Sequence, residues 1–147
     1  MSAESWAGPL YLDASALVKL IVSEPESDSL NDALAGAPDV VISDLALTEL
    51  ASALGRRTRE RALLPTQART VQRAAENLAA KCRRAELTPA VHRRAERLLL
   101  ASRTPPLRAL DALHLALAID AQAATLVTYD LRLRAAAASQ GLAVAPD

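Results

Sequence analysis

The sequence predicts an α/β domain whose short parallel sheet, of about five strands, is flanked by helices on both faces. Three observations indicate this fold. Short β-branched or apolar segments alternate with segments whose apolar residues follow helical spacing. Hydrophobic residues make up 51% of the 147 residues, which is enough for a substantial core. No apolar run reaches the ~18 residues of a membrane span, so we expect a single globular domain over residues 1–147, with its core at about 9–145.

The first half of the chain carries two predicted strands, and each ends in a polar residue. Apolar Pro9–Leu12 is followed by Asp13, and Val40–Ile42 is followed by Ser43. Ser43 or Asp44 is suited to cap the next helix. The expected elements are a strand at 9–12, a helix at 14–22, a second helix ended near 35 by Gly36 and Pro38, a strand at 39–43, a helix from 44 to about 62 and an arginine-rich helix at 65–84.

The second half is predicted to hold three more strands, the first of them weakly signalled. Pro89 is well placed in the first turn of a helix that follows this strand. The expected elements are a strand at 85–88, a helix from 89 to near 102, a loop at 104–106, a helix from about 108, a strand at 125–129, a helix at 131–140 ended by Gly141 and a strand at 142–145.

The segment from Leu107 to Asp130 organises the predicted site. A helix with apolar residues on more than one side leads there into the β-branched strand at 125–129. About 14 helical residues climb ~21 Å, and about five strand residues return ~16 Å. Asp111, in the first turn of the helix, and Asp130, just past the strand, should therefore lie on the same rim of the sheet. Two carboxylates on one rim repel each other unless a cation or a proton lies between them.

Two further acids are expected at the same rim, because ligands of open parallel sheets bind beyond the carboxyl ends of the strands. Asp13 follows the first strand, and Glu49 lies about one and a half turns into the helix after the second. Taken singly, each acid has an ordinary explanation as a cap, a helix-dipole partner or a solvated side chain. Together they suit Mg²⁺ or Mn²⁺, which prefers oxygen ligands and can activate a water against a phosphodiester.

The other titratable residues are expected to be structural. His114, three residues after Asp111 on an apolar helix, is expected to be a hydrogen-bonded core histidine. Asp44 is expected to be a cap and Asp120 a solvated helix residue. The single cysteine, Cys82, suits a reducing compartment, and the first eight residues lack the basic start and apolar stretch of a signal peptide. These features lead us to expect a cytoplasmic protein.

The net charge is zero, but its distribution is uneven. Between Arg56 and Arg108 there are 14 basic and 4 acidic residues, whereas the remainder holds 3 basic and 13 acidic residues. This basic segment forms either solvated helix faces or an arm that attracts phosphate. Arg56 lies seven residues beyond Glu49 and nearly on the same helix face, where it is either solvated or in contact with a substrate phosphate. With one Trp and two Tyr, a base-stacking platform is not expected.

Four segments, in their places and order, resemble PIN-domain ribonucleases, and in particular the small VapC-type toxins of bacterial toxin–antitoxin pairs. They are YLDASALVKL, SDLALTELASAL, RALDALHLALA and LVTYDLRLRAAA. The resemblance spans the chain from about Leu10 to Val144. It implies a Rossmann-like PIN fold with an acidic pocket that binds Mg²⁺ or Mn²⁺. It also implies endonucleolytic cleavage of RNA by a metal-activated water.

The resemblance assigns site residues by position in the motifs. Those that match the family's acids or their polar neighbours are Asp13, Glu49, Asp111, Asp130, Ser15 and Thr128. It implies that Asp13 and Asp111 are the principal metal ligands and that Glu49 and Asp130 orient the metal or the water. Ser15, the small hydroxyl residue beside the first acid, is expected to support it.

The resemblance also has one departure and implies partners. Some relatives carry a further acid shortly after the last aspartate, where this chain has Arg132, Leu133 and Arg134, so the number of metal ions stays open. The family implies a homodimer, an RNA substrate and a small VapB-type antitoxin that blocks the acidic pocket.

Three other functions make different demands on the residues. A haloacid-dehalogenase-like phosphatase would carry a second aspartate two residues after Asp13, where this chain has Ser15. A receiver domain would need an acidic pair at the first strand and a lysine after a late strand, but the only lysines are Lys19 and Lys81. A PIN-like binding module without catalysis remains open on the sequence alone.

Overall fold

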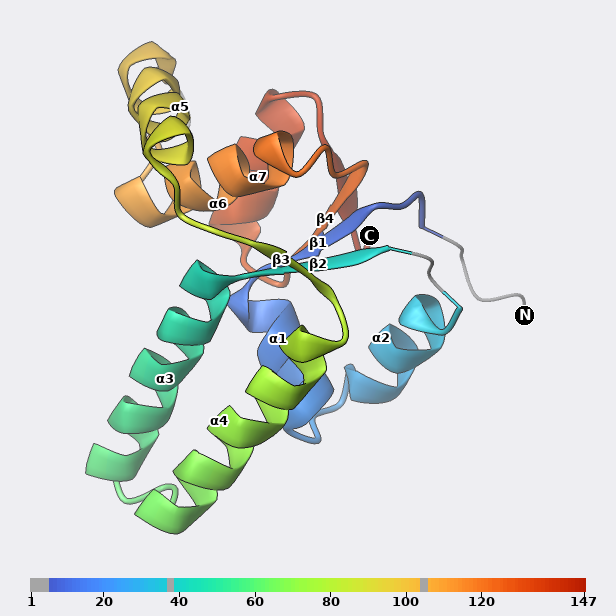
Figure 1. Ribbon diagram of the computed structural model, residues 1–147, viewed down its shortest axis with the longest axis vertical. Helices are drawn as coiled ribbons and strands as arrows, with labels where there is room; N and C mark the ends of the chain where they lie inside the picture. The colour runs from blue at the N-terminus through green and yellow to red at the C-terminus, as the bar shows by residue number, and fades with distance from the viewer. Residues whose placement is uncertain (1–5, 37–38, 104–105) are drawn as a thin grey trace.

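The structure is a computed structural model that describes residues 6–36, 39–103 and 106–147. Strands and helices alternate along much of the chain (Figure 1). In order they are β1 (Leu10–Leu12), α1 (Ala14–Ile21), α2 (Ser27–Leu34), β2 (Val40–Ser43), α3 (Asp44–Arg59), α4 (Pro65–Ala80), β3 (Arg83–Ala85), α5 (Pro89–Ala101), α6 (Ala109–Asp120), β4 (Thr125–Val127), α7 (Leu131–Ser139) and β5 (Ala143–Ala145). None of the helices in the described part of the chain is long and apolar enough to cross a membrane.

The strands form one parallel sheet in the order β3-β2-β1-β4-β5. β1 is central, and its last residue is in register with Ile42 of β2 and Val127 of β4. One position further along the chain lie Asp13, Ser43 and Thr128, which therefore share a level at the carboxyl edge. The chain proceeds outward from β1 to β3 on one side and from β4 to β5 on the other. Such a reversal opens a crevice at the carboxyl edge between β1 and β4.

Helices cover both faces of the sheet (Figure 1). Tyr11 and Leu126 belong to a core shared with α5, α6 and α7. Leu10 and Leu12 belong to a second core, shared with α1, α2, α3 and α4. Because successive residues of a strand point to opposite faces, β1 directs Tyr11 toward α6 and its two leucine neighbours toward α1. This alternation places the Tyr11 side chain against α6, the helix that carries Asp111.

Most of the predicted elements are confirmed, with ends that differ by a few residues. The helix that follows Ser43 ends at Arg59 rather than near residue 62. α6 buries residues on several sides, as its apolar pattern predicts. Gly141 ends α7 at φ +79°, a left-handed value that favours glycine. Pro38 of the predicted helix stop, and Thr104 and Pro105 of the predicted loop, lie outside the described residues.

The prediction was wrong for the end of the arginine-rich helix and for the third strand. α4 ends at Ala80 rather than residue 84, and β3 spans Arg83–Ala85 rather than 85–88. β3 is an edge strand whose neighbour is β2, and the Arg83 guanidinium donates to the Asp39 carboxylate at 3.1 and 3.2 Å and to the Ala121 carbonyl at 2.9 Å. Charged residues are common on edge strands, and they leave no apolar alternation for the sequence pattern to detect.

Candidate functional site

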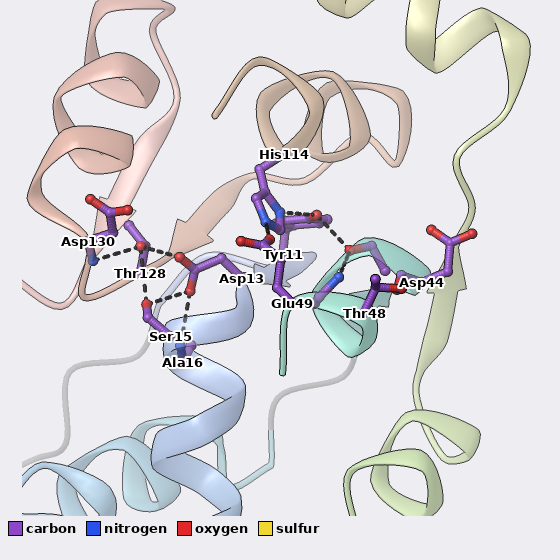
Figure 2. A network of polar contacts seen from close by, with 12 residues as sticks. Tyr11, Asp13, Ser15, Ala16, Asp44, Thr48, Glu49, His114, Thr128 and Asp130 are labelled. Atoms are coloured by element: carbon purple, nitrogen blue, oxygen red, sulfur yellow. Dashed lines mark hydrogen bonds and ion pairs between the residues drawn. The ribbon is translucent and has the colours of Figure 1, made fainter. Parts of the chain in front are cut away.

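Asp13 follows the central strand and is held by three donors (Figure 2). Its Oδ1 accepts from the Ser15 hydroxyl at 2.7 Å and from the Ala16 N–H at 3.0 Å. Its Oδ2 accepts from the Thr128 hydroxyl at 2.5 Å. The bond from Ala16 makes Asp13 the N-cap of α1, so its predicted alternative role as a helix cap is confirmed. The bond from Thr128 also connects the carboxylate to the residue that follows β4, 115 positions away along the chain.

Burial raises the pKa of the Asp13 carboxyl above its usual value. Hydrogen bonds from Thr128, Ala16 and Ser15 lower this pKa, as does the charge of His114, but they do not offset burial. Within the described residues no lysine or arginine forms an ion pair with Asp13. An ionised carboxylate in this buried position destabilises the folded protein when no metal is bound, and a cation beside it would offset that destabilisation.

Ser15 and Thr128 join the ends of β1 and β4 across the crevice. The Ser15 Oγ accepts the Tyr129 N–H at 2.9 Å, and the Thr128 Oγ1 accepts the Asp130 N–H at 3.0 Å. The two hydroxyls lie 3.4 Å apart. Each hydroxyl thus donates to Asp13 while its oxygen accepts a backbone N–H of the β4–α7 connection. The two predicted supporting residues therefore fix both the carboxylate and the loop beside it.

The Asp130 side chain is turned away from this web of bonds. Its residue is exposed, and its Oδ1 accepts the N–H of Arg132 at 2.9 Å and that of Leu133 at 3.4 Å. It is therefore the N-cap of α7. The structure brings the backbone of Asp130 into the site, while its carboxylate lies at the exposed edge.

Asp111 and Glu49 reach the carboxyl edge from two helices. Asp111 is the third residue of α6, where it is 7% exposed and accepts the Arg108 N–H at 3.4 Å. Glu49 extends from α3 with its side chain 29% exposed. Asp111 is thus a second buried carboxylate without an ion pair among the described residues, and Glu49 lies at the boundary between core and solvent.

Glu49 is reached by a chain of hydrogen bonds that sequence reasoning missed (Figure 2). The Nε2 of His114 contacts its Oε1, and the Nδ1 of His114 lies 2.7 Å from the Tyr11 hydroxyl. The Tyr11 hydroxyl donates to the Ser43 Oγ at 2.9 Å, which accepts the Ala46 N–H at 3.0 Å. The predicted hydrogen-bonded core histidine is confirmed. Its partners were not identifiable, because they lie 65 and 103 positions away along the chain.

A cleft of about 470 Å³ opens beside the acids, lined mainly by α1 and α3, and both Glu49 and Arg56 line it. Lys19 lines it too, but its ammonium already pairs with Glu24 at 2.7 Å and with Glu26 at 2.8 Å. Arg56 is exposed and forms no ion pair within residues 6–36, 39–103 and 106–147. Arg57 also lines the cleft and lies 3.8 Å from Glu24. Arg56, for which the sequence left open a solvated role or a phosphate contact, is therefore a cleft cation whose charge stays available to a ligand.

The donors at this edge fit a hard divalent cation, because they are carboxylate oxygens and two of them, on Asp13 and Asp111, are buried. In the part of the chain that the structure describes, no three His, Cys, Asp or Glu side chains are grouped as a metal site. Asp130 caps a helix and Glu49 is bonded to His114. The four acids thus share an edge, but each has its own partner in this arrangement.

Asp44 does not have the predicted role. Ser43 is the N-cap of α3, since its side chain accepts the Ala46 N–H. The two oxygens of Asp44 instead accept the Leu87 N–H, each at 3.2 Å, which connects α3 to the segment after β3. Asp120 is exposed, as expected.

Comparison with known proteins gives a consistent result. A family model described as PIN domain matches residues 10–139. The chain is 36% identical over 140 residues to Ribonuclease VapC49 of Mycobacterium tuberculosis, covering 93% of this chain and 94% of that protein. Its fold is similar to that of M. tuberculosis VapC20, a toxin that cleaves the Sarcin-Ricin loop, with a TM-score of 0.66 and 22% identity over 86% of this chain and 94% of that chain. It is also similar to VapBC2 from Rickettsia felis, solved with a DNA fragment from their promoter, with a TM-score of 0.67 and 17% identity over 92% and 96% of the two chains.

Proposed function

Because this chain belongs to the PIN-domain family and is related over nearly its whole length to a VapC ribonuclease, we propose that it is a metal-dependent endoribonuclease, the toxin of a VapBC-type toxin–antitoxin pair. Its substrate is RNA, and its cofactor is Mg²⁺ or Mn²⁺. A bound ion would supply positive charge and an activated water for hydrolysis of a phosphodiester.

One observation carries this proposal. Asp13 and Asp111 are both buried at the carboxyl edge of the sheet, and neither has a basic partner among the described residues. A fold rarely keeps two buried carboxylates unless a proton or a cation compensates them. An all-oxygen donor set at this position suits Mg²⁺ or Mn²⁺ rather than a softer metal.

The residues around these two acids have separate tasks. Asp13 and Asp111 bind the metal ion, and Ser15 and Thr128 hold the Asp13 carboxylate in place. Glu49 and Asp130, which are more exposed, orient the ion or the attacking water. Arg56, at the cleft, contacts a phosphate of the RNA.

The partners follow from the same assignment. The structural likeness to VapBC2 of Rickettsia felis supports a VapB-type antitoxin as the binding partner, and this antitoxin would block the acidic edge. We also propose a homodimer, and a cytoplasmic location where RNA is accessible.

The test is incubation of purified protein with total bacterial RNA and Mn²⁺ or Mg²⁺, followed by mapping of the new RNA ends. Purification through denaturation and refolding removes any bound antitoxin. Asp111→Asn and a chelator are the negative controls. Asp120→Asn is the matched control, because Asp120 is an exposed aspartate on the same helix.

We expect discrete cuts from the wild type and from Asp120→Asn, and none from Asp111→Asn or with chelator. Cuts that survive Asp111→Asn would contradict the site assignment. A refolded wild type that neither cuts RNA nor binds Mn²⁺ would favour the binding module without catalysis.

A further inference from the structure

His114 occupies a position that the proposed chemistry does not use. It lies one turn after Asp111 on α6, is 3% exposed, and both of its ring nitrogens have partners. Its Nε2 meets Glu49, and its Nδ1 meets the hydroxyl of Tyr11. Glu49 also lines the cleft, so the histidine is bonded to a carboxylate that a ligand can reach. A purely structural role for His114 does not require such a partner.

The buried end of this chain fixes the histidine ring. Tyr11 is 0% exposed, and its hydroxyl donates to the Ser43 Oγ at 2.9 Å. The same Tyr11 oxygen lies 2.7 Å from the Nδ1 of His114, so the phenol holds both Ser43 and the imidazole. The Tyr11 ring also meets the imidazole edge-on, with ring centres 5.8 Å apart and planes at 70°. The imidazole therefore has one orientation, which directs Nε2 at α3.

The consequence falls on Glu49. A glutamate on a helix surface has three flexible torsions and samples many rotamers in water. The contact with Nε2 holds its Oε1 toward α6. Its Oε2 has no protein partner among the described residues, and the side chain lines the same cleft as Ser15 and Arg56. One oxygen is thereby anchored and the other is left for a ligand.

We propose that His114 is a positioning residue that, braced by Tyr11, holds Glu49 in the orientation in which it serves the metal site. The inference rests on the proposed function and adds to it a residue that acts through Glu49 rather than on the metal or the RNA. In metal sites, the carboxylates that bind the ion are often held by hydrogen bonds from neighbouring residues. Mutation of such a neighbour typically lowers metal affinity or activity about 10- to 100-fold.

The experiment measures Mn²⁺ binding to the free protein by calorimetry, without RNA, so that its readout does not depend on cleavage. His114→Leu fills the volume of the ring but provides no donor. His114→Gln keeps an N–H that can reach Glu49. Tyr11→Phe keeps the aromatic ring and removes only the hydroxyl that braces His114.

Thr125→Val is the matched control. Thr125 is also buried, at 3% exposed, and its hydroxyl donates to the Ala7 carbonyl at 2.7 Å, but it lies at the opposite end of β4 from the site. Its loss removes a buried hydrogen bond of the same kind, so it reports the effect of general destabilisation on Mn²⁺ affinity.

We expect His114→Leu to weaken Mn²⁺ binding about 10- to 100-fold, with a smaller loss in Tyr11→Phe, substantial recovery in His114→Gln and no loss in Thr125→Val. In a Glu49→Gln background, the leucine substitution should change Mn²⁺ affinity by less than about twofold, because its effect passes through the carboxylate. If His114→Leu does not fold, Tyr11→Phe in the same two backgrounds gives the answer.

Mn²⁺ affinity unchanged in folded His114→Leu, or a loss that persists in the Glu49→Gln background, would overturn the positioning role and leave the proposed function intact. A wild type that binds no Mn²⁺ would overturn the metal-dependent function, and the positioning role with it. The two failures are therefore distinguishable.

Discussion

Replacing Asp13 by asparagine separates the stability of this protein from its function. Asp13 is 4% exposed, and burial outweighs all the hydrogen bonds of its carboxylate in setting its pKa, which is raised. The ionised side chain is therefore a net cost to the folded protein at neutral pH. Asparagine has nearly the same size, caps helices about as well as aspartate and carries no charge to desolvate. We expect Asp13→Asn to be more stable than the wild type in the absence of metal.

The magnitude follows from linkage between protonation and folding. Each unit by which the folded pKa exceeds the unfolded one costs about 1.4 kcal/mol at neutral pH. Relief of such a cost at a functional site commonly contributes about 0.5–2 kcal/mol. For a chain of this length, 1 kcal/mol corresponds to about 2–4 °C in Tm. We therefore expect a Tm increase of about 1–8 °C at pH 7 with a chelator present.

The sign of the pH dependence is fixed by the raised pKa of Asp13. Below the unfolded pKa of about 3.9, the aspartate is protonated in both states and adds no penalty. As pH rises from there through the folded pKa, the unfolded chain loses its proton first, so the wild type loses stability relative to Asp13→Asn. The Tm difference between the two proteins should therefore be small near pH 4 and reach its full size at neutral pH.

Metal should reverse the order of the two proteins. A ligand present at 100 times its Kd stabilises the folded state by about 2.7 kcal/mol. We expect Mn²⁺ to raise the Tm of the wild type above that of Asp13→Asn, which binds the ion weakly or not at all. The assay is thermal unfolding followed by circular dichroism, at several pH values, with chelator or with Mn²⁺.

Asp44→Asn is the control for this experiment, because it makes the same chemical change at a carboxylate with a structural role. Asp44 accepts the Leu87 N–H and lies in the first turn of α3, where a negative charge contributes about 0.3–1 kcal/mol. Its substitution should lower the Tm slightly. If Asp13→Asn also lowers the Tm at pH 7 without metal, or if its Tm advantage does not shrink toward pH 4, the reasoning from burial is refuted.

Three further outcomes are expected. Arg56→Gln should raise KM for RNA with little change in kcat, and it should lower the slope of log binding constant against log salt concentration by about one. Arg73→Gln, which changes an exposed arginine of α4, should have neither effect. Equal effects of the two substitutions would show that Arg56 has no particular role in the cleft. Thr128→Val should raise the pKa of the buried carboxylate to which its hydroxyl donates, as measured by carboxyl NMR titration of the metal-free protein, and an unchanged or lowered pKa would contradict this. Leu30 is 1% exposed, and Leu30→Ala should lower the free energy of unfolding, measured with denaturant, by about 2–5 kcal/mol. Leu100 is 89% exposed, and Leu100→Ala should lower it by less than about 0.5 kcal/mol. Similar losses for the two variants would mean that α2 is not part of the core.

Local patterns in the sequence were sufficient for most of the fold. The strand before Asp13 and the apolar helix that begins near Asp111 were predicted because the spacing of apolar residues reports which faces are buried. The parallel arrangement followed from the alternation of strands and helices. β3 was misplaced, because an edge strand that carries Arg83 and Arg84 has no apolar alternation to detect.

The position of the acids along the chain was likewise sufficient to predict the edge of the sheet at which they lie, since Asp13 and Asp130 follow strands, Glu49 is on the helix after β2, and Asp111 begins the helix that leads into β4. What each side chain bonds was decided only by the tertiary structure. Asp130 caps α7, and Glu49 is hydrogen-bonded to a histidine 65 positions away along the chain. The physical reason is that spacing along the chain sets the face on which a residue lies, whereas a hydrogen bond requires two atoms within about 3 Å. Only the packing of separate elements sets that distance.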